Sequence, residues 1–370
     1  MISINPGDVR SFGAKRDSHF YLVTNSKVVD KINIINDGSY LSYNKIIFDS
    51  DDDATVETLK GSFIQILQNK IPVKSHILVI APNNYFRAPP HEFIGPTRKI
   101  LILPCNSTPT DLDIINKFWE IIINTDPKSQ EEKAKYFFET AEKADYLEFV
   151  DYKNKTASIF KHMHEDYVWN EQGGFLNGGD QLLAPAGEIN VFNLPVQEFD
   201  EHLRLDFNGT LAFHGTPIVH SGTPSFSYRD QKRIYDLLSY LIDHPIIAHV
   251  KDGEIIDLSV RTKEGEIACN MLQSLFNVDS RYRILLEIGF GINTQSKIIK
   301  GNHAMNETFG GTNGVAHFGL GIIPFTQYHI DIICPNLKVL TNKGDLLIGS
   351  NETSFHMNRK KVSGCVCLDG

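Results

Sequence analysis

The chain has 370 residues, of which 41% are hydrophobic and 22% are charged, and its formal net charge is -9 at neutral pH. This composition is typical of a folded globular protein, and the acidic balance disfavours a nucleic-acid partner, whose phosphates attract clustered Lys and Arg. No apolar run reaches the roughly 20 residues of a membrane span, and the N-terminus MISINPGDVRSF lacks a secretory signal pattern. We therefore expect a cytoplasmic protein without a membrane segment.

The N-terminal part alternates strand-like and helix-like segments. Short β-branched or apolar runs predict strands at 20–29, 32–35, 75–81 and 99–103. Apolar residues at helical spacing predict helices at 56–70, 111–125 and 129–144. Thr108 or Thr110 is placed to cap the second helix, and Ser129 with Glu132 forms a capping-box pattern at the third. Alternation of this kind favours an α/β fold, a layered sheet with helices packed on it. Neither glycine-rich phosphate-binding motif is present, so no nucleotide site is predicted.

The sequence pattern changes in the C-terminal part, where many strand-like pieces are joined by Gly-containing turns. Two strand-like pieces flanking the polar turn YKNKT predict a hairpin, and Asp252-Gly253 and Lys343-Gly344 are further hairpin signals. Only 228–242 and 264–276 show helical spacing. The sequence therefore predicts an α/β domain over 1–174 and an α+β domain over 175–370, the latter with a curved, mostly antiparallel sheet or partial barrel.

A His-x-Asp pair stands in the most informative stretch of the C-terminal part. If Tyr328 to Ile333 is a strand, His329 and Asp331 project from one face while Ile330 packs behind them. Such a pair suits metal binding, but a buried His and a buried Asp also satisfy each other without a metal.

Two glutamates in the same part of the chain favour metal binding over a simple His–Asp pair. Glu188 follows the turn Pro185-Ala186-Gly187, which delivers its carboxylate at the start of a strand, and Glu287 is set in an apolar strand where an unpaired charge is costly. Together with His317 and the His-x-Asp pair, they make an N/O ligand set suited to zinc, cobalt, manganese or ferrous iron. A divalent metal is therefore the expected cofactor.

The order of four motifs resembles a known family. The motifs are PAGE, E-I-G-x-G-x-N, G-G-T-x-x-x-A-H-x-x-L-G and Y-H-I-D. In this order they are similar to the C-terminal domain of the M29 metallo-aminopeptidases, the aminopeptidase T group. The same domain is shared by the mononuclear iron 2,5-dihydroxypyridine dioxygenases. The resemblance covers 175–350, and the N-terminal half matches only in its general α/β character.

The resemblance implies a site and a reaction. It places two neighbouring metals on Glu188, Glu287, His317, His329 and Asp331, with Glu287 or Glu188 as the base that activates water. The implied function is hydrolysis of a peptide or amide substrate, and the family makes a homodimer an expectation. As an alternative, a dioxygenase would hold one ferrous ion with His317, His329 and Asp331.

Departures from the family pattern leave a third alternative, a non-catalytic protein that binds a peptide or another partner. The family has a Tyr where this chain has Pro324, and Asn306-Glu307-Thr308 replaces the usual acidic-lysine pair. Further histidines, His303 and His214, are predicted to line the substrate pocket because they lie near the motifs in chain order, and His220 lies in the same stretch as His214.

Overall fold

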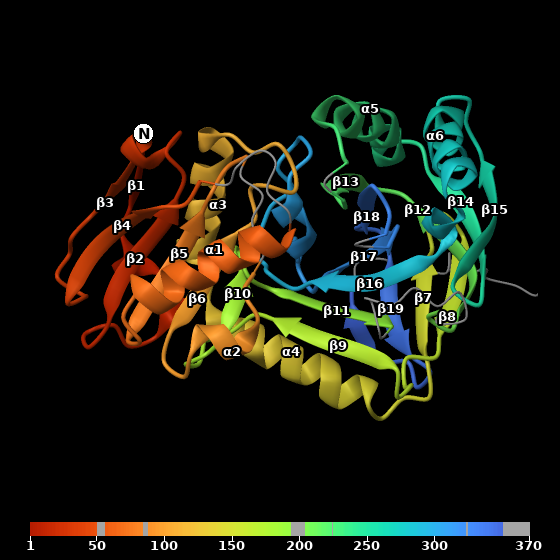
Figure 1. Ribbon diagram of the computed structural model, residues 1–370. Coiled ribbons are helices and arrows are strands. Elements are labelled where there is room, and N and C mark those ends of the chain that lie inside the picture. The colour runs from red at the N-terminus through yellow and green to blue at the C-terminus, as the bar shows by residue number, and fades with distance from the viewer. Residues whose placement is uncertain (50–55, 84–87, 194–203, 224, 323–324, 351–370) are drawn as a thin grey trace, which may run out of the picture.

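The computed structural model describes residues 1–49, 56–83, 88–193, 204–223, 225–322 and 325–350. Pro324 lies outside these residues. Figure 1 shows a sheet of the N-terminal half, in red and orange, beside two sheets of the C-terminal half, in yellow to blue. Within the described ranges no helix combines the length and the apolar character needed to cross a membrane.

A five-stranded parallel sheet forms the core of the N-terminal half, in the order β10-β6-β5-β2-β4. Its strands are β2 (His19–Thr24), β4 (Ser42–Ile47), β5 (Ser75–Ile80), β6 (Lys99–Leu103) and β10 (Gln181–Leu183). Successive side chains of strand β5 point to opposite faces of the sheet and pack into different hydrophobic clusters. Leu78 packs in a cluster with Ile115 of α3 (Leu112–Asn124), whereas Ile77 packs in a cluster with Phe63 of α1 (Val56–Asn69). Burial of both faces explains the continuous apolar runs and confirms the predicted α/β character.

The predicted capping residues of two helices are wrong. Helix α3 is capped by Asp111, whose carboxylate accepts a hydrogen bond from the Ile114 N–H at 2.9 Å, and not by Thr108 or Thr110. Helix α4 (Pro127–Ala141) begins before Ser129 and is capped by Asp126, which accepts a hydrogen bond from the Lys128 N–H. An Asp directly before a helix satisfies its free N–H groups, and Pro at the first helical position supports that earlier start.

The remaining N-terminal elements are small. Strands β1 (Ile2–Ile4) and β3 (Ile32–Ile34) form a separate parallel pair, and α2 (His91–Ile94) is a single turn. Strand β4 has no counterpart among the predicted elements. It is a half-exposed edge strand with mixed polarity, so neither an apolar run nor a clean alternation marks it in the sequence.

Two antiparallel sheets make up the C-terminal half. The seven-stranded sheet has the order β15-β14-β12-β8-β7-β19-β20, with β7 (Leu147–Asp151), β8 (Thr156–Phe160), β12 (Phe207–Phe213), β14 (Ile246–Lys251), β15 (Glu254–Val260), β19 (Lys338–Thr341) and β20 (Leu346–Ile348). The six-stranded sheet has the order β13-β18-β17-β16-β11-β9, with β9 (Tyr167–Gln172), β11 (Glu188–Asn193), β13 (Thr216–Ser221), β16 (Leu285–Gly291), β17 (Val315–Leu320) and β18 (Tyr328–Cys334). Both are open among the described strands, so the mostly antiparallel prediction is confirmed and no closed barrel forms.

The C-terminal core lies between these sheets. Phe318 of β17 approaches Phe149 and Phe207 of the seven-stranded sheet, with ring centroids 5.8 and 5.7 Å apart. Helices α4, α5 (Tyr228–Leu238) and α6 (Gly265–Val278) contribute side chains to the same cluster. One face of the six-stranded sheet is thereby buried in an apolar core, which leaves its other face for polar residues.

The predicted hairpin turns form, while the predicted boundary at 174 and 175 stays a prediction. Strands β7 and β8 pair antiparallel, and Asp252 and Gly253 take positive φ values of 49° and 73° between β14 and β15. Around the predicted boundary the chain passes between sheets. Strand β9 pairs with β11, whereas β10 pairs with β6 of the parallel sheet.

Candidate metal centre

The polar face of the six-stranded sheet gathers histidines and carboxylates from neighbouring strands. Period-two alternation sends Ile330 and Ile332 into the core and leaves His329 and Asp331 on the other face of β18. Paired residues in an antiparallel ladder share a face, which fixes the remaining members. These are His220 on β13, His317 on β17, Glu287 on β16, and Glu188 and Asn190 on β11.

Glycines opposite these residues provide the space for their side chains. Gly289 pairs with His317, and Gly319 pairs with both Asp331 and Glu287. A Cβ atom at Gly319 would lie 2.7 Å from Cε1 of His329 and 2.9 Å from Cβ of Glu287, and one at Gly289 would collide with the His317 imidazole. Gly289 of the E-I-G-x-G motif and Gly319 on β17 therefore leave the space that the His317 and His329 side chains occupy.

Replacing Gly289 by alanine is expected to displace the His317 imidazole and to cost about 1–3 kcal/mol of stability, as overpacking typically does. Metal affinity should fall with it. Zinc titration and thermal unfolding of Gly289→Ala measure both effects. Gly265→Ala is the matched control, since the nearest atom to its new Cβ is Thr262 Oγ1 at 3.1 Å, away from the strands of the site. Unchanged zinc affinity in Gly289→Ala would contradict this role of the glycine.

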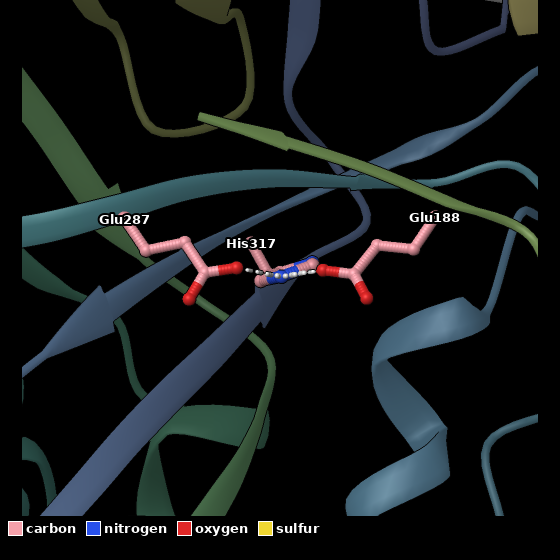
Figure 2. Close-up of side chains that lie close together, drawn as sticks. All are labelled: Glu188, Glu287 and His317. Atoms are coloured by element: carbon pink, nitrogen blue, oxygen red, sulfur yellow. Dashed lines mark ion pairs between the residues drawn. The ribbon is translucent and has the colours of Figure 1, made fainter. Parts of the chain in front are cut away.

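The first donor set consists of Glu188, Glu287 and His317 (Figure 2). The His317 Nε2 atom lies 3.2 Å from Oε1 of Glu188 and 4.0 Å from Oε1 of Glu287, so the imidazole stands between two carboxylates. Asn190 donates hydrogen bonds from Nδ2 to the same two oxygens, at 3.1 and 2.8 Å. Asn190 thus fixes the orientation of both carboxylates.

The second donor set consists of Glu287, His329 and Asp331. The His329 Nε2 atom lies 3.5 Å from Oε2 of Glu287 and 3.2 Å from Oδ1 of Asp331. On the other side of the ring, Nδ1 donates a hydrogen bond to the Gly321 carbonyl at 2.9 Å. This bond directs the Nε2 atom into the site, as backbone carbonyls commonly do for metal-binding histidines.

The third donor set consists of His220, Glu307 and Asp331. The His220 Nε2 atom lies 2.8 Å from Oδ2 of Asp331 and 3.5 Å from Oε2 of Glu307. Glu307 comes from η6 (Ala304–Thr308), a short 3₁₀ helix that borders the sheet. Glu287 is therefore common to the first two sets, and Asp331 to the last two.

Burial and mutual charge shift the pKa values of these groups strongly. Burial, aided by the nearby Glu307 charge, raises the pKa of Glu188 to about 7. Burial lowers the pKa of His317, but the hydrogen bond to Glu188 and the charges of Glu188, Asp331 and Glu287 together outweigh burial and raise that pKa to about 9. Burial also lowers the pKa of His329, but the charges and hydrogen bonds of Asp331 and Glu287 together raise it well above its usual range. Without a cation the site therefore holds protonated imidazoles among carboxylates.

The residues present fit a divalent cation. Two ligands about 2.1 Å from a tetrahedral ion are about 3.4 Å apart, and the imidazole nitrogens of the first two sets lie 3.2 to 4.0 Å from their carboxylate oxygens. In addition, Oδ1 of Asp331 is fully buried, and its 3.2 Å ion pair with His329 lacks hydrogen-bond geometry. Imidazole and carboxylate donors suit zinc, cobalt, manganese or iron.

The five predicted ligands thus lie together, whereas the two predicted pocket histidines lie apart from the donor sets. The His303 ring packs edge-on against Phe118 of α3, with centroids 6.4 Å apart. His214 follows β12, and its Nδ1 is 2.9 Å from Nδ2 of Asn154 and 3.2 Å from that of Asn336. Neither histidine belongs to a donor set of the described residues.

The sequence patterns predict no metal-ligand role for His220 and Glu307 and no place in the site for Asn190. His220 lies directly opposite His329 in the β13–β18 ladder, a relation that needs the strand register. Asn190 is two residues after Glu188, so the alternation of strand β11 was the available signal for it. Glu307 belongs to no regular strand, and nothing in its local sequence indicates which way it points.

A cavity of about 630 Å³ lies along the edge strand β9, and none of the described residues that line it belongs to a donor set. Its lining includes Gln172 and Asn170. Gln172 pairs with Glu188 across the β9–β11 ladder, and Asn170 donates a hydrogen bond to the Asn190 side chain at 3.0 Å. The cavity is therefore one strand away from the carboxylates of the first set.

Comparison with known proteins establishes the fold. No protein-family model and no curated protein matches the sequence. Among solved structures, 2,5-dihydroxypyridine dioxygenase from Pseudomonas putida KT2440 aligns with a TM-score of 0.54 at 12% identity, over 93% of this chain and 94% of that one. The chain shares this fold. AmpT from Thermus thermophilus aligns with a TM-score of 0.45 at 12% identity, over 91% of this chain and 93% of that one. The dioxygenase is of the type that the sequence motifs resemble, so the resemblance is confirmed at the level of the fold.

Proposed function

We propose that the chain is a metal-dependent hydrolase that cleaves a peptide or amide bond with a metal-activated water. The observation that supports this proposal is the sharing of Glu287. Its Oε1 faces the first donor set and its Oε2 faces the second, at the distances given above. A carboxylate that offers one oxygen to each of two neighbouring sites is what a two-metal hydrolase requires.

In this proposal the site residues have different roles in the reaction. Bound divalent ions would polarise the scissile carbonyl and lower the pKa of a bound water toward about 7. Glu188 and Glu287 are the two carboxylates placed to accept the proton of that water, and Asn190 holds the Oε1 atom of each. The cavity beside β9 is the proposed binding place of the substrate, because Gln172 and Asn170 connect it to these carboxylates.

The arrangement of the histidines favours a hydrolase over the iron oxygenase that the sequence leaves open. That oxygenase would use His317, His329 and Asp331 together on one ion. Among the described residues His317 belongs to the first donor set, whereas His329 and Asp331 belong to the second. The three predicted iron ligands therefore do not converge on one position.

Assays of the metal-free chain reloaded with zinc, cobalt or manganese test the proposal. We expect release of amine from aminoacyl amides and short peptides, dependent on added metal. Glu139→Gln, an exposed carboxylate change on α4, is the control for non-specific effects. Turnover that requires iron and consumes oxygen would instead establish the oxygenase. Absence of turnover with every metal would support the non-catalytic alternative.

A further inference from the structure

We propose that His220, Glu307 and Asp331 form a third divalent-cation site, next to the two sites of the proposed hydrolase, on whose metal binding this inference rests. The three donors come from β13, η6 and β18, so tertiary structure alone brings them together. Their side chains are 11%, 12% and 3% exposed. The cluster is thus nearly as enclosed as the first two donor sets.

The third set is as compact as the first two, and its shorter contact is also a hydrogen bond. The His220 Nε2 atom lies 2.8 Å from Asp331 and 3.5 Å from Glu307, against the 3.2 to 4.0 Å found in the other two sets. In each of the three sets the ligand atoms lie within 4.8 Å of one another, close enough to share one small cation, whose tetrahedral ligands are about 3.4 Å apart.

The His220 imidazole is held in place from behind. Its Nδ1 atom lies 3.3 Å from Oγ of Ser107, which leaves Nε2 directed at the carboxylates. The neighbouring Val219 carbonyl accepts hydrogen bonds from Gln231 at 2.7 Å and Asn302 at 2.9 Å. Gln231 is fully buried and also donates to the Ser107 carbonyl, so one amide fixes both segments around the ring. Such support of a ligand is characteristic of metal sites.

Asp331 connects the third set to the second in the way that Glu287 connects the second to the first. Its Oδ1 faces His329 at 3.2 Å and its Oδ2 faces His220 at 2.8 Å. The three sets therefore follow one another across the sheet, with one shared carboxylate at each junction. A chain of this kind offers three positions for cations and not two.

Charge also favours a cation at this position. The three sets contain four carboxylates and three imidazoles. Among the described residues, no Lys or Arg forms an ion pair with any of these carboxylates. Buried carboxylates need a compensating charge, and the imidazole and carboxylate donors here suit zinc, cobalt or manganese. The competing interpretation is that protonated His220 merely bridges Asp331 and Glu307.

Counting bound cobalt distinguishes the two interpretations. The full-length metal-free chain is titrated with Co²⁺, freed of excess metal by gel filtration, and analysed by mass spectrometry and visible absorption. We expect three cobalt ions per wild-type chain and two in His220→Ala. Glu307→Gln keeps the shape of the side chain and should also bind two, which guards against misfolding of the alanine variant. His317→Ala should lose one ion from the other end, so His220→Ala/His317→Ala should keep one.

The outcomes separate this inference from the proposed function. Two ions in wild type and still two in His220→Ala and Glu307→Gln would overturn the third site and leave the hydrolase site intact. No bound cobalt in wild type would overturn the proposed function itself. Cobalt-edge anomalous scattering from crystals of the wild-type chain, with a peak between His220 and Glu307, would support the third site without any variant.

Discussion

Replacing Glu287 by alanine is expected to empty two donor sets at once and to abolish hydrolysis. Its carboxylate is the only one that the first and second sets have in common, with one oxygen toward His317 and the other toward His329. The loss in kcat/KM should exceed the roughly 10–100-fold that removal of an outer partner of a metal ligand costs. Steady-state kinetics at saturating zinc, together with the metal content of the purified variant, measure this.

Asn190→Ala provides the graded comparison for that experiment. Asn190 orients Glu188 and Glu287 by hydrogen bonds without belonging to a donor set, so its loss should weaken metal binding by about 10–100-fold and leave the sites refillable at high zinc. Glu139→Gln should behave as wild type. If Glu287→Ala kept wild-type metal content and rate, the shared-carboxylate arrangement would be refuted.

Metal binding is expected to release protons and to tighten steeply with pH. In the metal-free chain the pKa of His317 is raised to about 9 by Glu188, and that of His329 is raised well above its usual range by Asp331. Both imidazoles are therefore protonated at pH 7 and must lose their protons to bind metal. Filling the first two sets should release about two protons per chain from these imidazoles and part of a third from Glu188, whose pKa is about 7, so the overall binding constant should rise at least about a hundredfold per pH unit from pH 7 until His317 titrates.

Calorimetry in two buffers of different ionisation enthalpy counts these protons. His317→Ala should release about one proton fewer than wild type. The direction of the effect is fixed by the raised pKa values, since groups that are already neutral at pH 7 would give no release. Metal affinity that stays flat between pH 7 and 8 would show that the imidazoles are not protonated in the metal-free site.

Sequence patterns were informative where one local rule decided the structure. The apolar runs 75–81 and 99–103 correspond to β5 and β6 because a strand buried on both faces has few alternatives. His329 and Asp331 share a face of β18 because alternation within a strand is a local property. The order of the four motifs then brought Glu188, Glu287 and His317 to the same region.

Relations between distant segments required the structure. The pairing of His220 with His329 depends on the register between β13 and β18, which no local pattern encodes. Glu307 reaches the site from a 3₁₀ helix, and its contact with His220 depends on how that loop packs on the sheet. His303 was predicted to line the pocket from chain order alone, but its ring packs against Phe118 of the N-terminal half.

Anomalous diffraction from crystals of the zinc-loaded chain tests the central claim most directly. The claim is that Glu287 stands between two cations, one held with Glu188 and His317 and the other with His329 and Asp331. We predict a zinc-edge peak on each side of the Glu287 carboxylate, about 3.5–4 Å apart, as in known two-metal sites. A single peak held by His329 and Asp331 without Glu188, or no peak beside Glu287, would contradict it.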